Sequence, residues 1–258
     1  MNKTRAIVLH RFAYSDSSFI VKALTEECGV VSFIVKGGKR KESPFKGALD
    51  PLALSEVVFR QNPSTELQFI KEASVIDWHA SLRQSLLNLA EAQVMAEMVL
   101  RYAPPGAPLV EEFTLLDESL KALDMSAPPE GIFASWLLQT SEHWGYQLDL
   151  GTCSRCEKTL TEPAADFFPE SGMLICKDCQ GVVAPRARAE TMRGLWELHR
   201  CEMGTGPNAS KIPIFLPGRD FVENALLSYL RNHIGFVRDI HSLSWLQEVR
   251  KLCSVQSK

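Results

Sequence analysis

The residues with the clearest chemical spacing are four cysteines arranged in two close pairs. Cys153 and Cys156 form the first pair, Cys176 and Cys179 form the second, and 19 residues separate the pairs. Two intervening residues let each pair fold into a tight turn with both sulfurs facing one ion, a spacing typical of a tetrahedral zinc site. Four thiolates fill the coordination shell and leave no position for a catalytic water. The sequence therefore predicts one structural Zn²⁺, with the residues between the pairs forming a short hairpin.

Other uses of paired cysteines fit this sequence less well. Two disulfides need an oxidising compartment, yet residues 1–4 lead into a strand-like segment without a signal peptide. A redox Cys-x-x-Cys motif usually stands alone at the start of a helix. An iron–sulfur cluster also takes four thiolates and stays open, although its usual spacing differs. The remaining cysteines are isolated and are expected to be buried reduced thiols: Cys28, Cys201 and Cys253.

A second chemical feature is the cationic loop, residues 36–46, which holds five Lys or Arg residues and one acid. Its glycines allow a close approach to phosphate, its cations neutralise phosphate, and Ser43 can add a hydrogen bond. The loop lacks the spacer of a P-loop, and a solvated surface turn is the alternative. We expect a nucleic-acid strand to cross here, with Phe12 or Tyr14 stacking a base. The predicted contact residues are Arg11, Tyr14, Lys36, Lys39, Arg40, Lys41 and Lys46.

The first 78 residues have the pattern of a β domain that can position this loop. Runs rich in β-branched residues are separated by turn-forming residues, and they span residues 5–10, 18–24, 30–35, 52–59 and 67–73. The short connections leave no room for crossover helices, so we expect a small closed barrel. An OB-fold is the commonest five-stranded choice, and an SH3-like barrel is the alternative. The cationic loop then joins the third and fourth strands at one end of the binding face.

From residue 81 onwards, apolar residues recur at helical spacing. The predicted helices are residues 82–99, 109–123, 132–148, 185–202, 220–230 and 241–253. The fold class is therefore α+β, with a five-stranded OB-fold barrel followed by a mainly α-helical domain. We expect a nucleic-acid-binding domain at 1–78 and a helical domain at 79–258, into which residues 151–181 are inserted as a four-cysteine zinc module.

Charge is segregated along the chain, although the net charge is only −3. Residues 1–78 carry 11 Lys and Arg against 9 Asp and Glu, residues 79–150 carry 3 against 10, and residues 182–258 carry 11 against 7. Basic ends therefore flank an acidic middle, and such a distribution permits phosphate binding that a uniformly acidic surface would oppose. The sequence contains no repeats and no transmembrane candidate, and we expect a cytoplasmic, nucleoid-associated protein.

The sequence also bears on catalysis and on partners. We find no paired carboxylates, nucleophile elbow or dinucleotide fingerprint, so an enzyme is not predicted. The helix after the cysteines alternates cations with Leu195, Trp196 and Leu198. This stripe is either a docking site for an acidic partner peptide or a packed helix with a solvated basic side. The candidate partner-binding residues are Arg186, Arg188 and Arg193.

Several short segments follow one another in an order and spacing that are specific together. They are residues 6–9, 14–17, 24–29, 35–41, 49–52 and 92–97, the two cysteine pairs, and residues 229–235. With this order of segments, the chain resembles the RecO family of bacterial recombination mediator proteins over nearly its whole length.

The resemblance implies an N-terminal OB-fold, a helical domain and an inserted zinc-binding segment. It further implies binding to single- and double-stranded DNA, annealing of complementary strands and, with RecR, loading of RecA onto single strands covered by single-strand DNA-binding protein. The acidic C-terminal tail of the latter is expected to dock on the protein. A zinc-containing scaffold whose partners contact the DNA remains the alternative. A nuclease or ligase fragment is disfavoured because carboxylate pairs for magnesium are missing.

Overall fold

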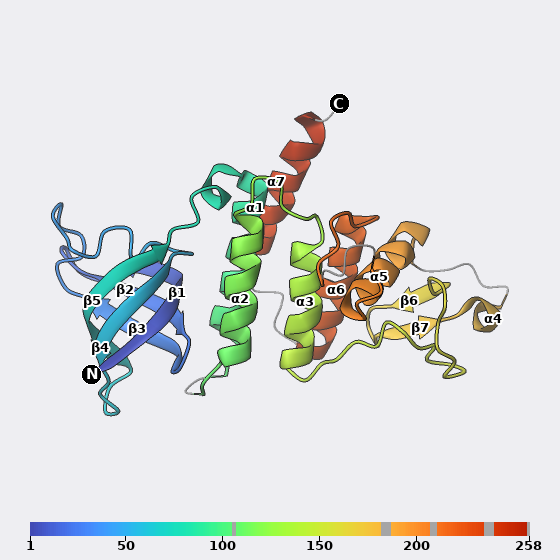
Figure 1. Cartoon of the computed structure of the whole chain (residues 1–258), viewed down its shortest axis with the longest axis horizontal. Helices are drawn as coiled ribbons and strands as arrows, with labels where there is room; N and C mark the ends of the chain where they lie inside the picture. Colours follow the sequence, from blue (N-terminus) through green and yellow to red (C-terminus); the bar gives the residue numbers. More distant parts are fainter. Residues whose placement is uncertain (105–106, 182–186, 207–210, 235–239, 257–258) are drawn as a thin grey trace. The chain divides into compact units, whose positions relative to one another are not determined.

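The chain begins with five strands that close into a barrel. The structure is a computed structural model, and it describes residues 1–104, 107–181, 187–206, 211–234 and 240–256. The strands are β1 (Asn2–Ala13), β2 (Phe19–Thr25), β3 (Gly29–Val35), β4 (Leu54–Arg60) and β5 (Leu67–Asp77). Their order around the barrel is β1-β2-β3-β5-β4, with β3 and β5 parallel and the other neighbours antiparallel (Figure 1). This arrangement is that of an OB-fold and confirms the predicted barrel.

Alternating residues of the strands fill the barrel interior. Val21 and Ala23 of β2 point inward, as do Phe33 and Val35 of β3. The rings of Phe33 and Phe59 meet edge to face, with centroids 5.1 Å apart and an interplanar angle of 74°. Burying one such side chain contributes roughly 1.5–3 kcal/mol to the stability of the folded state. The packed interior therefore holds the strands, and with them the connections at the barrel ends, in place.

Three helices and a short 3-10 turn pack with the barrel. They are η1 (Leu82–Gln84), α1 (Leu86–Tyr102), α2 (Val110–Leu123) and α7 (His241–Gln256). Helix α1 packs on β1, α2 and α7. Ser85 caps α1 by accepting a hydrogen bond from the Asn88 N–H, which satisfies one free donor of the first turn. The end of the chain therefore returns to a helix that begins more than a hundred residues earlier.

The chain divides into two compact units, Met1–Ser126 with Ile240–Lys258 and Ala127–Asp239. In the first unit, α1, α2 and α7 group with the barrel. The second unit includes the cysteine segment and can be regarded as an insertion between α2 and α7.

The second unit is built around α6 (Arg219–Ile234), against which α3 (Ile132–His143) and α5 (Ala189–Glu202) pack. A Cβ at Gly194 of α5 would lie 2.3 Å from the Pro217 carbonyl oxygen and 2.4 Å from Val222, so this close packing requires glycine. The predicted helix 132–148 is too long: α3 ends at His143, and Gly145 follows with φ +83°. The unit also contains β6 (Asp166–Phe168), β7 (Met173–Ile175) and the short α4 (Lys177–Gln180).

None of the described helices combines the length and the apolar character that a membrane span requires.

Candidate nucleic-acid surface and metal centre

The cationic loop follows β3 and is held in place by its own turns and by the neighbouring connection. The backbone N–H of Lys39 donates to the Ser17 carbonyl at 3.1 Å, and Lys39 Nζ donates to the Ser15 carbonyl. A Cβ at Gly38 would lie 2.3 Å from the Phe19 ring, so only glycine allows the loop to pass this close to β2. The loop and the β1–β2 turn therefore form one surface at one end of the barrel.

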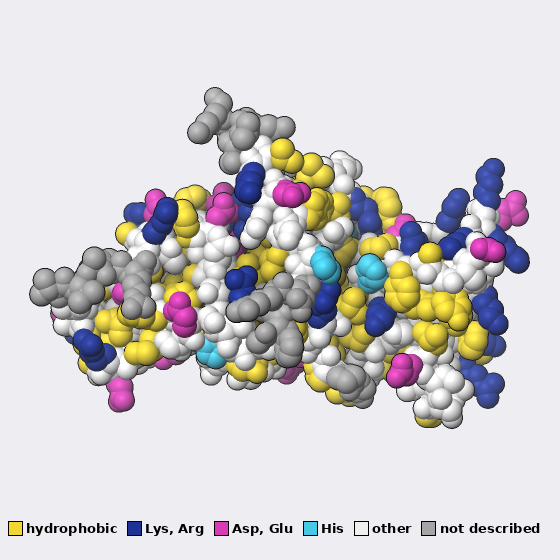
Figure 2. Space-filling model, turned by 180° about the vertical axis from the view of Figure 1, so that it is seen from behind, with side chains coloured by type: hydrophobic (Ala, Val, Ile, Leu, Met, Phe, Trp, Pro, Cys, Tyr) yellow, Lys and Arg dark blue, Asp and Glu magenta, His cyan; other side chains and the backbone are white. Residues whose placement is uncertain are grey.

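The cations of the loop project into solvent without acidic partners. Lys36, Lys39, Arg40, Lys41 and Lys46 are all exposed, and none forms an ion pair with a described residue. Figure 2 shows Lys and Arg side chains gathered over the barrel, which lies on the right in that view. Because no carboxylate in the described part of the chain pairs with these charges, the loop can attract a phosphate backbone.

Exposed aromatic rings accompany the loop. Tyr14 in the β1–β2 turn is 58% exposed, Phe12 is 38% exposed and Phe69 of β5 is 52% exposed. Lys36 Nζ lies 4.9 Å from the centre of the Phe69 ring, and Phe69 pairs with Ile34 of β3. The sequence did not distinguish Phe69 from a core residue, because an aromatic residue in a strand is equally compatible with either face.

Two predicted contacts differ from expectation. Arg11 belongs to β1, which continues to Ala13. Its guanidinium forms an ion pair with Asp50 at 2.7 Å and lies 5.2 Å from the centre of the Phe19 ring. Ser43 is buried, and its Oγ accepts a hydrogen bond from the Phe45 N–H at 3.3 Å. Arg11 is therefore partly neutralised, and Ser43 shapes the loop instead of facing solvent.

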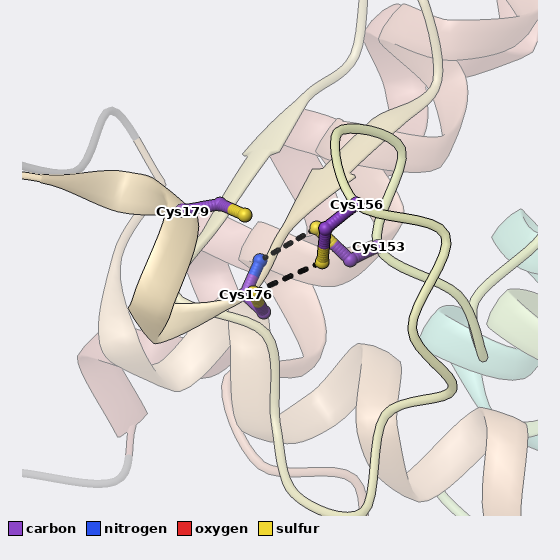
Figure 3. Close-up of side chains that lie close together, drawn as sticks. All are labelled: Cys153, Cys156, Cys176 and Cys179. Atoms are coloured by element: carbon purple, nitrogen blue, oxygen red, sulfur yellow. Dashed lines mark hydrogen bonds between the residues drawn. The ribbon is translucent and has the colours of Figure 1, made fainter.

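The four cysteines of the two pairs converge on one point in the second unit (Figure 3). Their sulfur atoms all lie within 4.8 Å of one another, and the Sγ atoms of Cys156 and Cys176 are 3.8 Å apart. A tetrahedral ion with bonds of about 2.3 Å to sulfur requires sulfur separations of roughly 3.8 Å. The cluster can therefore hold a metal ion in the geometry that the spacing suggested.

Backbone hydrogen bonds build the first cysteine turn and attach it to the hairpin. The Glu157 N–H donates to the Cys153 carbonyl at 2.8 Å, and the Cys153 N–H donates to the Lys158 carbonyl at 3.0 Å. Glu157 adopts the left-handed conformation, with φ +59°. Ser154 and Leu174 exchange two hydrogen bonds, of 2.8 and 3.0 Å. These bonds place the first sulfur pair beside strand β7.

The second pair follows the hairpin expected from the sequence. Strands β6 and β7 are antiparallel and turn at Gly172, which has φ +71°. Cys176 immediately follows β7, and the Cys179 N–H donates to the Cys176 carbonyl at 3.1 Å. The hairpin thus returns the second pair to the first.

The cysteine environment favours negative charge on one sulfur and opposes it on another. Burial opposes ionisation of Cys153, but N–H groups of Cys176, Cys156 and Arg155 outweigh burial and lower the pKa of Cys153 to about 6. Hydrogen bonds with Cys156 and Cys176, together with burial and the charge of Cys153, raise the pKa of Cys179 to about 12. A bound cation removes this conflict because it stabilises all four thiolates together.

The predicted partner-binding residues lie on or before α5. Arg186 lies outside the described residues. Arg188 precedes the helix and its guanidinium is 4.2 Å from the centre of the Phe221 ring, while Arg193 is exposed. Leu195 and Leu198, the leucines of the candidate docking stripe, are buried. The helix is therefore a packed helix whose solvent side carries both charges, with Arg193 and Glu190 exposed and Arg200 paired with Glu197.

Comparison with known proteins identifies the family. The family model described as Recombination protein O N terminal matches residues 1–79, and Recombination protein O C terminal matches residues 83–242. A DNA repair protein RecO from Anaeromyxobacter dehalogenans strain 2CP-C is 28% identical over 250 residues, covering 97% of each chain. A DNA repair protein RecO from Geobacter metallireducens is 31% identical over 179 residues, covering 69% of this chain and 72% of the relative. The barrel, the helices and these matches together show that the chain belongs to the RecO family.

Proposed function

We propose that the protein is a DNA-binding recombination mediator in DNA repair. The observation that carries this proposal is the group of unpaired cations in the cationic loop, beside exposed rings at one end of an OB-fold barrel. Membership of the RecO family, whose similar relatives are named DNA repair proteins, supports the same role.

The proposed binding mode combines charge with stacking. Lys36, Lys39, Arg40, Lys41 and Lys46 contact phosphates, and Tyr14 stacks on a base of a single strand. Contacts to phosphate carry no sequence information, so the protein binds any sequence and accepts both single-stranded and double-stranded DNA. Neutralising about four phosphates predicts a log–log salt slope near −3 for single strands.

Salt-titrated binding to single-stranded and duplex oligonucleotides tests the proposal. Replacing Lys39, Arg40 and Lys41 together by Ala should weaken binding to every sequence alike and make the salt slope shallower. A matched triple variant with the exposed residues Lys3, Lys121 and Lys211 replaced by Ala removes the same charge away from the loop and should have a smaller effect. Unchanged binding in the loop variant would contradict the proposed surface.

We propose that the protein acts by binding and not by catalysis. It anneals complementary strands and, with RecR, loads RecA onto single strands covered by single-strand DNA-binding protein, at the nucleoid in the cytoplasm. Annealing of complementary oligonucleotides without ATP, followed by RecA filament formation in the presence of RecR, tests this mechanism. A requirement for ATP in the annealing step would contradict it.

We propose that the cysteine cluster holds one structural Zn²⁺. The near-tetrahedral sulfur separations and the four-thiol donor set support zinc, and four protein ligands complete its shell. When bound, the ion crosslinks the two cysteine turns and neutralises their thiolate charge. Elemental analysis of protein purified without chelator should find one equivalent of zinc, whereas iron in its place would contradict the identity of the metal.

Docking of the acidic tail of single-strand DNA-binding protein at Arg188 and Arg193 stays a prediction. Because Leu195 and Leu198 are buried, they cannot contact the tail, and only the charges of the arginines support this docking site. A tail peptide should bind wild-type protein more tightly than an Arg193→Glu variant, and equal affinities would show that the tail does not dock here.

A scaffold that binds only proteins is the second candidate function. Retention of the protein on single-stranded DNA without partners would favour the DNA-binding mediator over this scaffold.

A further inference from the structure

A cleft lies in the first unit between the barrel and the helices that pack on it. Its volume is about 770 Å³, and it is lined by β1 and β2, by α1 and by the start of α7. A second cleft of about 480 Å³ continues from it, and Lys22 and Leu100 line both. The second cleft reaches Gln61 and Gln68, at the connection between β4 and β5. Lys22 therefore stands at the junction of the two clefts.

The strand pattern directs Lys22 outward. Its neighbours Val21 and Ala23 fill the barrel core, so the side chain of Lys22 points to the outer surface of β2. The other outward residues of this strand, Ile20 and Leu24, are buried. Lys22 is thus a partly buried cation between two apolar residues, on a strand face that α1 helps to cover.

A β-bulge places a second basic side chain beside it. The pairing of β1 with β2 shifts between Val8 and His10, so that Val8 opposes Ala23 while His10 opposes Lys22. The bulge at Leu9 reverses the alternation of β1 and turns His10 to the outer surface. Directly opposed side chains of this kind have Cβ atoms about 5 Å apart. An anion bound by the Lys22 ammonium can therefore also accept a hydrogen bond from a ring N–H of His10.

The acids near the first cleft are already engaged. Glu97 accepts hydrogen bonds from the backbone N–H groups of His241 and Ser242 and from the Ser242 hydroxyl, at 3.1, 2.8 and 2.7 Å. It also pairs with Arg101 at 2.9 Å, and Asp50 pairs with Arg11. Among the described residues, no carboxylate forms an ion pair with Lys22. Glu66 lines the second cleft and is the acid that a bound anion would have to avoid.

Arg11 lies between the first cleft and the cationic loop. Arg11 lines the cleft and lies over the Phe19 ring, and Gly38 of the loop packs against the same ring. A strand bound at the loop can therefore continue past Arg11 to Lys22 and on towards the β4–β5 connection. OB-fold barrels bind oligonucleotides along this face, between the first and the last connections.

A single strand and a duplex differ in their access to Lys22. A flexible single strand can lower one phosphate into the cleft, whereas a duplex carries its phosphates on a stiff convex surface that cannot enter beside α1. We propose that Lys22, opposite His10, is a phosphate contact used by single strands and not by duplex DNA, and that it sets the preference between them. This inference rests on the proposed DNA binding and adds its selectivity.

Binding of a single-stranded oligonucleotide of about 15 nucleotides and of the matching duplex to the full chain tests the proposal. Lys22→Gln should weaken single-strand binding about five-fold, reduce the salt slope by about 0.7, and leave duplex binding unchanged. Lys22→Arg keeps the charge and should keep most of the affinity. Lys3→Gln is the matched control, because it removes an exposed β1 cation that is paired with Glu56. It should leave the affinity for both the single strand and the duplex unchanged.

The outcomes separate the inference from the function on which it rests. If Lys22→Gln lowers the affinity for single strands and duplex equally, Lys22 does not set the selectivity. If this variant keeps its affinity for both, while the loop triple variant binds both more weakly, the Lys22 contact is wrong and the proposed function stands. If neither variant loses affinity, the proposed surface itself is wrong. If a polyglutamate peptide binds wild-type protein but not Lys22→Gln, while Lys22→Gln leaves single-strand affinity unchanged, the cleft binds an acidic peptide and the proposal is overturned.

Discussion

Glu157 shows how a single backbone conformation controls the first cysteine turn. It directly follows Cys156 and adopts φ +59°, a region that costs an L-residue about 1 kcal/mol. Its N–H nevertheless closes the turn onto the Cys153 carbonyl. The side chain is exposed and contributes little packing, so the backbone requirement dominates at this position.

We predict that metal affinity follows the order Gly, Glu, Val at position 157. Glu157→Gly removes the conformational strain and should retain or slightly improve affinity, while Glu157→Val should lose about 1–2 kcal/mol because a β-branched residue strongly disfavours positive φ. Competition with a chromophoric chelator measures the order. Lys158→Val alters the next, exposed residue and should be close to neutral, and an equal loss there would contradict the conformational explanation.

Phe69 illustrates an aromatic residue that contributes to the surface and not to the core. Phe69→Ala should weaken single-strand binding by about 1–3 kcal/mol, because the ring offers a stacking face beside Lys36. Phe69→Tyr should retain affinity. Ile76→Ala removes another exposed apolar side chain of β5 and serves as the control. Fluorescence titration with a labelled oligonucleotide distinguishes these variants, and equal effects of Phe69→Ala and Ile76→Ala would exclude stacking.

At the residue scale, the sequence predicted groups whose spacing is local. The cysteine pairs and the loop cations are close in sequence, so their proximity did not depend on the rest of the fold. The pairing of Lys22 with His10 and the exposure of Phe69 could not be recognised in this way, because the first depends on a bulge in β1 and the second on the pairing of β5 with β3. The bulge shifts the register of β1 without a clear signal such as glycine or proline.

The α1–α7 pair is the element whose stability depends most clearly on one side chain. Glu97 of α1 accepts from the first two N–H groups of α7, so it acts as an N-cap supplied by another helix. Burial opposes its charge, but hydrogen bonds from Ser242, His241 and Arg101 outweigh burial and lower the pKa of Glu97 below its ordinary value of 4.5. Its stabilising effect is therefore fully present above the ordinary pKa and is lost as the pH falls through the lowered value.

We predict that Glu97→Gln destabilises the protein by about 1–2 kcal/mol at neutral pH. The difference from wild type should shrink as the pH falls below about 4.5, because the wild-type carboxylate is then protonated. Urea unfolding followed at neutral and acidic pH measures both effects. Glu118→Gln, at an exposed position of α2, should leave the unfolding free energy nearly unchanged, and a pH-independent loss in Glu97→Gln would contradict the capping role.

At the element scale, periodicity predicted the barrel strands and most helices, and it failed where tertiary structure decides. The length of α3 was overestimated because apolar residues continue past Gly145, whose positive φ accompanies the end of the helix. The return of α7 to α1 was not predictable, since the ion pair of Glu91 with Arg250 joins residues 159 positions apart. Local patterns specify an element, but they do not specify its partner.

At the scale of the whole molecule, the candidate metal and DNA sites lie in different compact units. The cysteine cluster belongs to Ala127–Asp239, while the cationic loop and both clefts belong to the unit that contains the barrel. The barrel has its own buried core and needs no contribution from the cysteines to hold the loop. Loss of metal should therefore be a local event, confined to the second unit.

We predict that Cys176→Ala abolishes metal binding and unfolds the β6–β7 hairpin, because metal binding contributes on the order of 10 kcal/mol to the folding of such modules. Hydrogen exchange should rise at residues 151–181 and remain unchanged in β1–β5, and affinity for a single-stranded oligonucleotide should stay within about two-fold of wild type. Cys201→Ala removes a buried thiol of the same unit outside the cluster and should retain the metal. A parallel loss of oligonucleotide affinity in Cys176→Ala alone would show that the two units are coupled, and the independence argued from their separate cores would then be wrong.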